Sequence, residues 1–99
     1  MADQLIYIDG EFLPKDEAKV SVFDHGLLYG DGVFEGIRAY RAERGTAIFR
    51  LPEHIDRLFN SAHIFQMKMP YDRATITEAH RAVVRANRLE SCYIRPIVF

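Results

Sequence analysis

The sequence has little of several features that would mark a specialised class of protein. Its 99 residues include one cysteine, Cys92, and no tryptophan, while 13 Lys+Arg nearly balance 14 Asp+Glu. A single cysteine cannot form an internal disulfide, and a free cysteine is most often a small buried apolar residue. A net charge near zero gives no electrostatic footprint for a polyanion. We therefore expect neither nucleic acid nor an anionic membrane as a partner.

Long apolar runs and motifs for metal or nucleotide binding are also missing. The apolar runs are a few residues long, far short of the roughly 20 that a membrane-spanning helix needs. Residues 1–4 lack the basic and apolar layout of a signal peptide, so we expect a cytoplasmic protein. The four histidines show no metal-ligand spacing, and no P-loop, Rossmann glycine pattern or nucleophile elbow occurs. The sequence therefore predicts no metal site.

What is present suits one packed domain, since 48% of the residues are hydrophobic. Residues 5–8 and 11–14 are two short strand-like segments that flank Asp9-Gly10, a pair that accepts the positive φ angles of a tight turn, which predicts a β-hairpin. Residues 20–23 are expected to form a short strand or a buried turn. Residues 24–32 contain three glycines, which favour a structured loop over a regular element.

Residues 33–40 alternate as a strand does, and residues 46–49 would form the returning strand after a polar turn. The alternation gives the strand two faces, one with Phe34, Gly36 and Arg38 and the other with Val33, Glu35 and Ile37. Glycines at 30, 32 and 36 allow a close approach of the backbone to a ligand or to another segment, although glycine habits alone favour an ordinary tight turn.

Two helices are predicted next. Pro52 suits the first turn of one helix, whose buried face would consist of Ile55, Leu58, Phe59 and Ala62, leaving Asp56 and Arg57 off this face. Thr75 and Glu78 have the spacing of a capping box, followed by an apolar face of Ile76, Ala79, Val83 and Ala86. Strands, two helices and a final strand indicate an α+β domain, in which both helices pack on one face of a mainly antiparallel sheet.

The last residues, 92–99, form an aromatic and β-branched run that predicts a strand. Arg95 within it needs a partner for its charge, and Pro96 implies a sheet edge or a bulge. Domain boundaries normally fall in polar linkers, so we expect residues 1–99 to be one amino-terminal domain that continues into a second domain.

Three segments together resemble the class IV aminotransferases. They are residues 24–40 (DHGLLYGDGVFEGIRAY), residues 49–58 (FRLPEHIDRL) and residues 93–96 (YIRP), in the family's order and spacing. The FEGIR and YIRP versions are similar to the branched-chain subgroup. The resemblance implies the small domain of a pyridoxal 5'-phosphate enzyme, a homo-oligomer (dimer or hexamer), that transfers the amino group of leucine, isoleucine or valine to 2-oxoglutarate. Its small-molecule partners would be amino acids and 2-oxo acids.

The resemblance also implies roles for single residues. Arg57 matches the arginine that holds the cofactor phosphate, a task that suits a permanently charged bidentate donor. The implied substrate residues are Tyr29, Phe34 and Gly36 for the side-chain pocket, Arg38 as a site-facing residue, and Tyr93 and Arg95 for the substrate carboxylates.

A catalytic residue is not expected within this chain. The reaction needs a lysine that bonds to the cofactor, and the resemblance places it in the larger carboxy-terminal domain. Lys15, Lys19 and Lys68 match no catalytic position and are expected on the surface. The alternatives are a D-amino-acid aminotransferase or an aminodeoxychorismate lyase, against which residues 93–96 argue, and a stand-alone, non-catalytic module that binds a small ligand.

Overall fold

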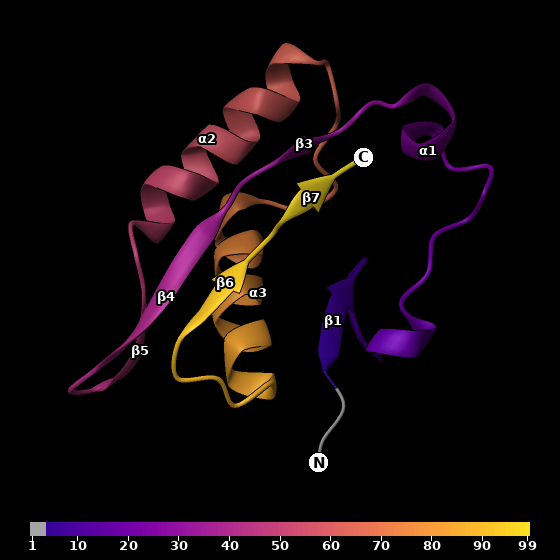
Figure 1. The fold of residues 1–99 in the computed structure, drawn as a ribbon. Helices are drawn as coiled ribbons and strands as arrows, with labels where there is room; N and C mark the ends of the chain where they lie inside the picture. Colours follow the sequence, from indigo (N-terminus) through magenta and orange to yellow (C-terminus); the bar gives the residue numbers. More distant parts are fainter. Residues whose placement is uncertain (1–3) are drawn as a thin grey trace.

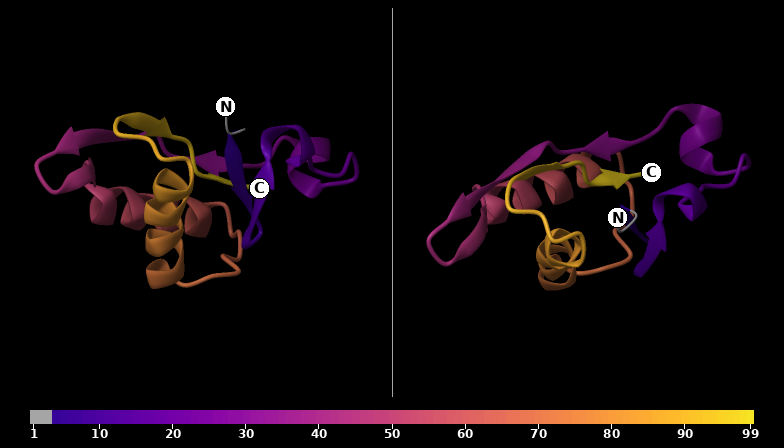
Figure 2. Two further views of the ribbon diagram at one scale, coloured as in Figure 1. Left: turned by 90° about the horizontal axis from the view of Figure 1, so that it is seen from below. Right: turned by 60° about the horizontal axis from the view of Figure 1, so that its bottom comes forward.

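The computed structural model describes residues 4–99, in which the strands of residues 33–48 and 92–98 form one layer with the two long helices on one side of it, and the hairpin of residues 5–14 is a separate sheet beside the second long helix (Figures 1 and 2). All strand pairs in this part of the chain are antiparallel, so the predicted α+β class is confirmed. The elements in chain order are β1 (Leu5–Ile8), β2 (Glu11–Pro14), the 3-10 turn η1 (Lys15–Glu17), α1 (His25–Tyr29), β3 (Val33–Phe34), β4 (Ile37–Ala42), β5 (Gly45–Ile48), α2 (Leu51–Ile64), α3 (Arg73–Ala86), β6 (Cys92–Ile94) and β7 (Ile97–Val98).

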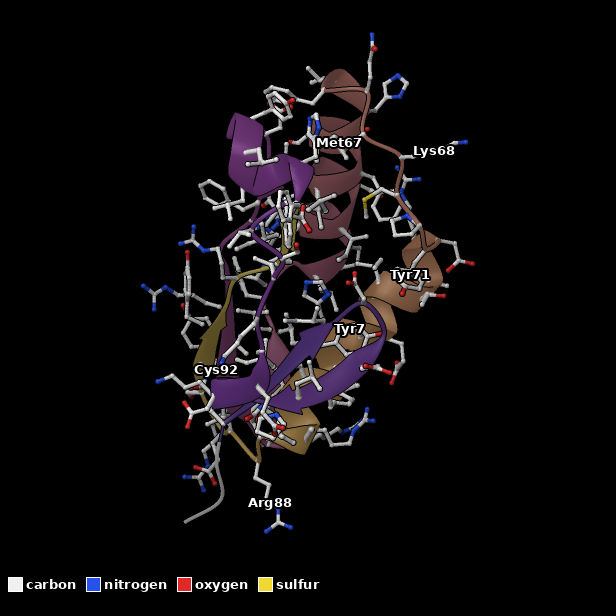
Figure 3. All side chains as sticks on the ribbon, turned by 90° about the vertical axis from the view of Figure 1, so that its right-hand side faces the viewer. Tyr7, Met67, Lys68, Tyr71, Arg88 and Cys92 are labelled. Carbon is white, nitrogen blue, oxygen red and sulfur yellow. The ribbon has the colours of Figure 1, made fainter. Side chains whose placement is uncertain are left out.

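The predicted amino-terminal hairpin is confirmed. Strands β1 and β2 pair in the register Leu5↔Pro14 to Ile8↔Glu11. Asp9 (φ 49°) and Gly10 (φ 85°) form the connecting turn, because both accept the left-handed conformation that a two-residue hairpin loop requires. Seen from the side in Figure 3, the hairpin with Tyr7 lies against α3, and Tyr71 belongs to the segment that leads into this helix.

The central ladder pairs the strand segments β3 and β4 with β7 and β6. Strand β3 pairs with β7, and β4 pairs with β6. Residues 35 and 36 separate β3 from β4, residues 95 and 96 separate β6 from β7, and the pairing register is the same before and after them. The two pairs of segments therefore keep one continuous register. Its pairs include Val33↔Val98, Phe34↔Ile97, Ile37↔Ile94 and Arg38↔Tyr93.

The ladder is interrupted where residues 35 and 36 lie opposite residues 95 and 96. Pro96 has no N–H to donate, so regular pairing lapses there, although the Glu35 N–H still donates to the Pro96 carbonyl at 3.1 Å. The predicted strand at 33–40 is therefore two segments. No residue is inserted, so Pro96 marks a sheet edge rather than a bulge: β6 is an outer strand in the order β5-β4-β6.

Helix α2 packs its predicted face against the strands. Pro52 lies in its first turn, and Ile55, Leu58 and Ala62 are buried, with Phe59 packed at the edge of the core. The core contains Val33 beside Leu58 and Ala62, and Ile37 beside Leu51 and Ile55. The prediction for this helix is confirmed.

Helix α3 begins earlier than the predicted capping box. Asp72 is the N-cap, and its Oδ1 accepts a hydrogen bond from the Thr75 N–H at 2.8 Å. Hydrogen bonding from Thr75, through its side chain and then its N–H, lowers the pKa of Asp72. The face that α3 buries includes His80 and Val84, whereas Ala86 is exposed, so the expected apolar face is wrong in part. No helix within residues 4–99 is long and apolar enough to cross a membrane.

Two expectations for residues 20–32 are wrong. Residues 20–23 form neither a strand nor a buried turn, and Phe23 is 83% exposed. Residues 25–29 form the short helix α1 instead of a loop, because Asp24 caps its start and Gly30, in the left-handed conformation (φ 70°), ends it. Of the three glycines that argued against a regular element, Gly30 ends this helix and Gly26 lies within it.

Candidate functional site

Five of the six predicted substrate residues lie together on the face of the sheet away from the helices. We call Phe34, Gly36, Arg38, Tyr93 and Arg95 the open-face cluster. Alternation along the antiparallel ladder puts these residues on one face, because Arg38 pairs with Tyr93 and the buried residues between them face the helices.

Arg95 connects the members of the open-face cluster. Its Nη2 donates a hydrogen bond to the Tyr93 hydroxyl at 2.7 Å, and its guanidinium lies 4.6 Å from the centroid of the Phe34 ring. The Arg38 guanidinium lies 5.7 Å from the centroid of the Tyr93 ring. Cation–π contact with the rings partly replaces water around these charges. Arg95, which was expected to need a partner for its charge, therefore contacts the Phe34 ring and the Tyr93 hydroxyl.

Gly36 gives the cluster its shape. A Cβ atom at this position would overlap the Tyr93 hydroxyl, so the tyrosine ring can lie across the strand only because residue 36 has no side chain. The expected close approach of the backbone at Gly36 is thus to Tyr93. A hydroxyl and guanidinium groups beside an aromatic wall can bind a carboxylate and an apolar chain at one place.

Tyr29, the sixth predicted substrate residue, is not brought into this cluster. It ends α1, is exposed, and packs its ring at 4.7 Å from the His25 ring centroid. A cavity of about 570 Å³ lies between β5 and α3, and its lining includes Arg81, Arg85 and Arg88 but none of the predicted site residues.

Arg57 lies on the helix side of the sheet, where it binds Glu35. Its Nε donates to Glu35 Oε2 and its Nη2 to Oε1, both at 2.8 Å. His54 Nδ1 is 2.7 Å from the same Oε1. We call Glu35, His54 and Arg57 the Glu35 trio. The structure confirms that Arg57 is off the buried face of α2, but it does not place Arg57 in the open-face cluster.

Glu35 is an ionised carboxylate in an apolar setting, only 5% exposed between Val33 and Ile37. Hydrogen bonds from Arg57 lower the pKa of Glu35, burial opposes this shift, and the hydrogen bond to His54 adds to the lowering. The same pairing raises the pKa of Arg57. The trio therefore keeps a negative charge inside the domain at neutral pH and holds a positive charge at its surface.

Sequence reasoning assigned no role to Glu35 or His54, although signals for both were present. A glutamate on the apolar face of a strand requires a partner, because a buried charge is costly unless it is paired. His54 and Arg57 are three residues apart on one helix and so lie on the same flank. Combining the two signals would have predicted the trio.

The other residues named from the sequence lie outside both groups. Lys15, Lys19 and Lys68 are exposed as expected, and the Lys68 side chain extends outward in Figure 3. Cys92 is half-buried, and burial raises the pKa of its thiol. Within residues 4–99 no three His, Cys, Asp or Glu side chains gather in a way that could hold a metal ion.

The antiparallel ladder and its two covering helices match the fold of solved branched-chain amino acid aminotransferases. Residues 32–99 match the family described as amino-transferase class IV, so the chain belongs to this family. Within the family it is similar to the branched-chain enzymes. It is 58% identical over 97 residues to the branched-chain-amino-acid aminotransferase of Pseudomonas aeruginosa, an alignment that covers 98% of this chain and 32% of the relative.

Solved structures agree with this assignment. The T.th. branched-chain amino acid aminotransferase complexed with N-(5'-phosphopyridoxyl)-L-glutamate superposes with a TM-score of 0.91 at 49% identity, over 98% of this chain and 33% of that one. The same enzyme complexed with 4-methylvaleric acid gives a TM-score of 0.92 at 50% identity, over 96% of this chain and 32% of that one. The chain thus spans about a third of the length of these relatives.

Proposed function

We propose that residues 1–99 are the amino-terminal small domain of a pyridoxal 5'-phosphate-dependent branched-chain-amino-acid aminotransferase. The full-length protein would transfer the amino group of leucine, isoleucine or valine to 2-oxoglutarate and act as a homo-oligomer. The observation that carries the proposal is the open-face cluster, in which Arg95 contacts both Phe34 and the Tyr93 hydroxyl.

The cluster meets the central requirement of such an enzyme, which must accept an aliphatic and an anionic side chain in one pocket. The Phe34 ring offers an apolar wall, and the neighbouring Arg95 offers donors for the distal carboxylate of glutamate. Tyr93 would donate to the substrate α-carboxylate. The T.th. relative is solved with both an adduct of glutamate and 4-methylvaleric acid, one anionic and one aliphatic side chain, which supports this assignment.

The donor set of Arg57 fits the cofactor phosphate. Glu35 occupies one edge of the guanidinium, Nη1 makes no hydrogen bond within residues 4–99, and the side chain is 67% exposed. Its free edge can therefore donate to a second anion. Pyridoxal phosphate, when bound, withdraws electrons from the substrate's α-carbon. The lysine that the cofactor requires would come from the larger domain, so the 99-residue chain alone is expected to be inactive.

The test is an Arg95→Gln variant of the full-length protein, compared with the unmodified enzyme in leucine–2-oxoglutarate transamination. Because Arg95 is assigned to the distal carboxylate, we expect the KM for 2-oxoglutarate to rise by about tenfold or more, which corresponds to the loss of a charged hydrogen bond. The KM for leucine should change much less. Steady-state kinetics with each substrate varied in turn measure this split.

Arg41→Gln is the matched control, because Arg41 is an exposed arginine that lies 3.8 Å from Glu90, away from the open-face cluster. It should leave both constants unchanged. Equal effects of Arg95→Gln on the two substrates, or no leucine transamination by the full-length protein, would remove the proposed function.

A further inference from the structure

Burying the Glu35 carboxylate costs free energy of desolvation, and the packing of the fold does not explain why the trio is there. Val33 and Ile37, the neighbours of Glu35 on its strand face, are buried apolar residues, and an apolar residue at position 35 would continue the same core. A buried ion pair is weak evidence for stability, since the cost of desolvation offsets much of the attraction. The carboxylate therefore calls for an explanation other than packing.

The geometry of the trio restrains Arg57 closely. Both carboxylate oxygens of Glu35 accept hydrogen bonds from Arg57, and this bidentate contact fixes the plane of the guanidinium. An exposed arginine without such a contact samples many rotamers. His54 donates to the oxygen that also binds Arg57 Nη2, which restrains the carboxylate itself.

The trio also links the two halves of the proposed site. Glu35 lies between Phe34 and Gly36 of the open-face cluster, and its N–H donates to the Pro96 carbonyl next to Arg95. The side chain of Glu35 points to the helices while those of its neighbours point away from them. A movement of Glu35 would therefore shift Arg57 relative to the residues assigned to the substrate.

We propose that Glu35, braced by His54, is a positioning residue that presents the free edge of the Arg57 guanidinium to the cofactor phosphate. The proposal rests on the proposed function, in which Arg57 binds that phosphate. Glu35 acts only through Arg57 and touches neither substrate nor cofactor. Its contribution is to remove in advance the rotamer entropy that Arg57 would otherwise lose on binding.

A double-mutant cycle in the full-length protein tests this role. The variants are Glu35→Gln, Arg57→Ala and the double variant, and the readout is the dissociation constant of pyridoxal phosphate from fluorescence titration of the apo-protein. Glutamine keeps the size of the side chain, but only one of its two terminal atoms accepts hydrogen bonds, so it cannot form the bidentate contact with Arg57. We expect about tenfold or greater weakening for Arg57→Ala and at least about threefold for Glu35→Gln.

Coupling between the two positions is the decisive result. If Glu35 acts through Arg57, then Glu35→Gln has no further effect in the Arg57→Ala background. Independent, multiplicative effects would show that Glu35 has only a structural role and would overturn the inference. The inference would also be overturned if Arg57→Ala weakened cofactor binding and Glu35→Gln did not. Unchanged cofactor affinity in Arg57→Ala would instead remove the proposed role of Arg57.

Two further variants keep the test sharp. Asp56 lies beside Arg57 on α2, and its exposed carboxylate pairs with Arg73 of α3 at 3.1 Å. Asp56→Asn removes this carboxylate, and we expect unchanged cofactor affinity. If Glu35→Gln does not fold, His54→Phe replaces it in the cycle, because His54 contributes a single hydrogen bond to the trio. The expectation is the same: weaker binding in the native background and no added effect with Arg57→Ala.

Discussion

His80 on α3 is a buried imidazole that only partly satisfies its hydrogen-bonding groups. It is 5% exposed, and its Nδ1 bonds to the Ile76 carbonyl at 2.7 Å, so Nδ1 carries the proton of a neutral ring. Its Nε2 has no partner within residues 4–99. Burial lowers the pKa of His80, the hydrogen bond to the Ile76 carbonyl partly opposes this shift, and the nearby His54 adds to the lowering. The folded domain therefore resists protonation of this ring.

This burial predicts a loss of stability in mild acid. The pKa of His80 is lower in the folded state than in the unfolded state, so as the pH falls below about 6.5 the unfolded chain takes up the proton first. The contribution of His80 to the free energy of unfolding is fully present above that pH. Below it the contribution declines by at most about 1.4 kcal/mol per pH unit, the limit for one titrating group. Denaturant unfolding at pH 7.5 and pH 5.5 measures the decline.

His80→Leu is the matched variant, because leucine fills a similar space and cannot titrate. Its free energy of unfolding should fall less between the two pH values than that of the unmodified protein. Glu35 does not confuse the comparison, since its pKa is lowered and it stays ionised throughout this range. An identical pH dependence in both proteins would refute the assignment of the effect to His80.

At the scale of elements, Asn87 fastens the amino-terminal hairpin to the end of α3. Its Oδ1 accepts from the Leu5 N–H at 2.7 Å, and its Nδ2 donates to the carbonyls of Leu5 and Val83 at 2.9 and 2.8 Å. The hairpin is short, and an isolated pair of strands is marginally stable in water. The amide of Asn87 thus replaces the missing neighbour of β1 at Leu5.

We expect Asn87→Ala to loosen the hairpin without unfolding the rest of the domain. The loss of these hydrogen bonds at a half-buried position should cost about 1–3 kcal/mol. Amide hydrogen exchange followed by mass spectrometry should show faster exchange in residues 5–14. Asn60→Ala is the control, since Asn60 is exposed on α2, and its exchange pattern should stay that of the unmodified protein. Unchanged protection of residues 5–14 in Asn87→Ala would contradict this role.

The elements that sequence patterns predicted are those whose signal is local and repeated. The face of α2 and the alternation at residues 33–40 follow from the periods of helix and strand, and both are confirmed. Two of the wrong expectations concern single capping residues: Asp24 starts α1 despite its glycine, and Asp72 starts α3 before Thr75. One side chain decides a helix boundary, and a propensity averaged over a window does not resolve it.

Prediction of the candidate site depended on the resemblance more than on pattern. Strand alternation placed Phe34, Gly36 and Arg38 on one face. Their position beside Tyr93 and Arg95 depends on a strand register that links distant parts of the chain. The Glu35–Arg57 ion pair likewise joins residues 22 positions apart, from a strand and a helix. Such contacts are set by packing, which the sequence does not show locally.

At the scale of the whole molecule, the domain has one covered face and one open face. Its extents of 42 × 31 × 18 Å describe a thin body, with α2 and α3 on one side of strands β3 to β7 (Figure 2). The open face exposes large apolar side chains, among them Phe34, Tyr93 and Ile97. Large apolar side chains exposed together on one face usually mark an interface. In the proposed enzyme it would face the larger domain across the active site.

The open face predicts that the 99-residue chain associates with itself when it is studied alone. Sedimentation velocity over a range of concentrations should show a rising weight-average mass, because apolar side chains leave water when two open faces meet. Ile97→Lys places a charge on this face and should shift association to about tenfold higher concentration. Ile64→Lys is the control, since Ile64 is a similarly exposed apolar residue at the end of α2, away from the open face, and should leave association unchanged. Equal effects of the two lysines would show that general hydrophobicity, rather than this face, drives association. A monomer at all concentrations would contradict the prediction that the open face associates.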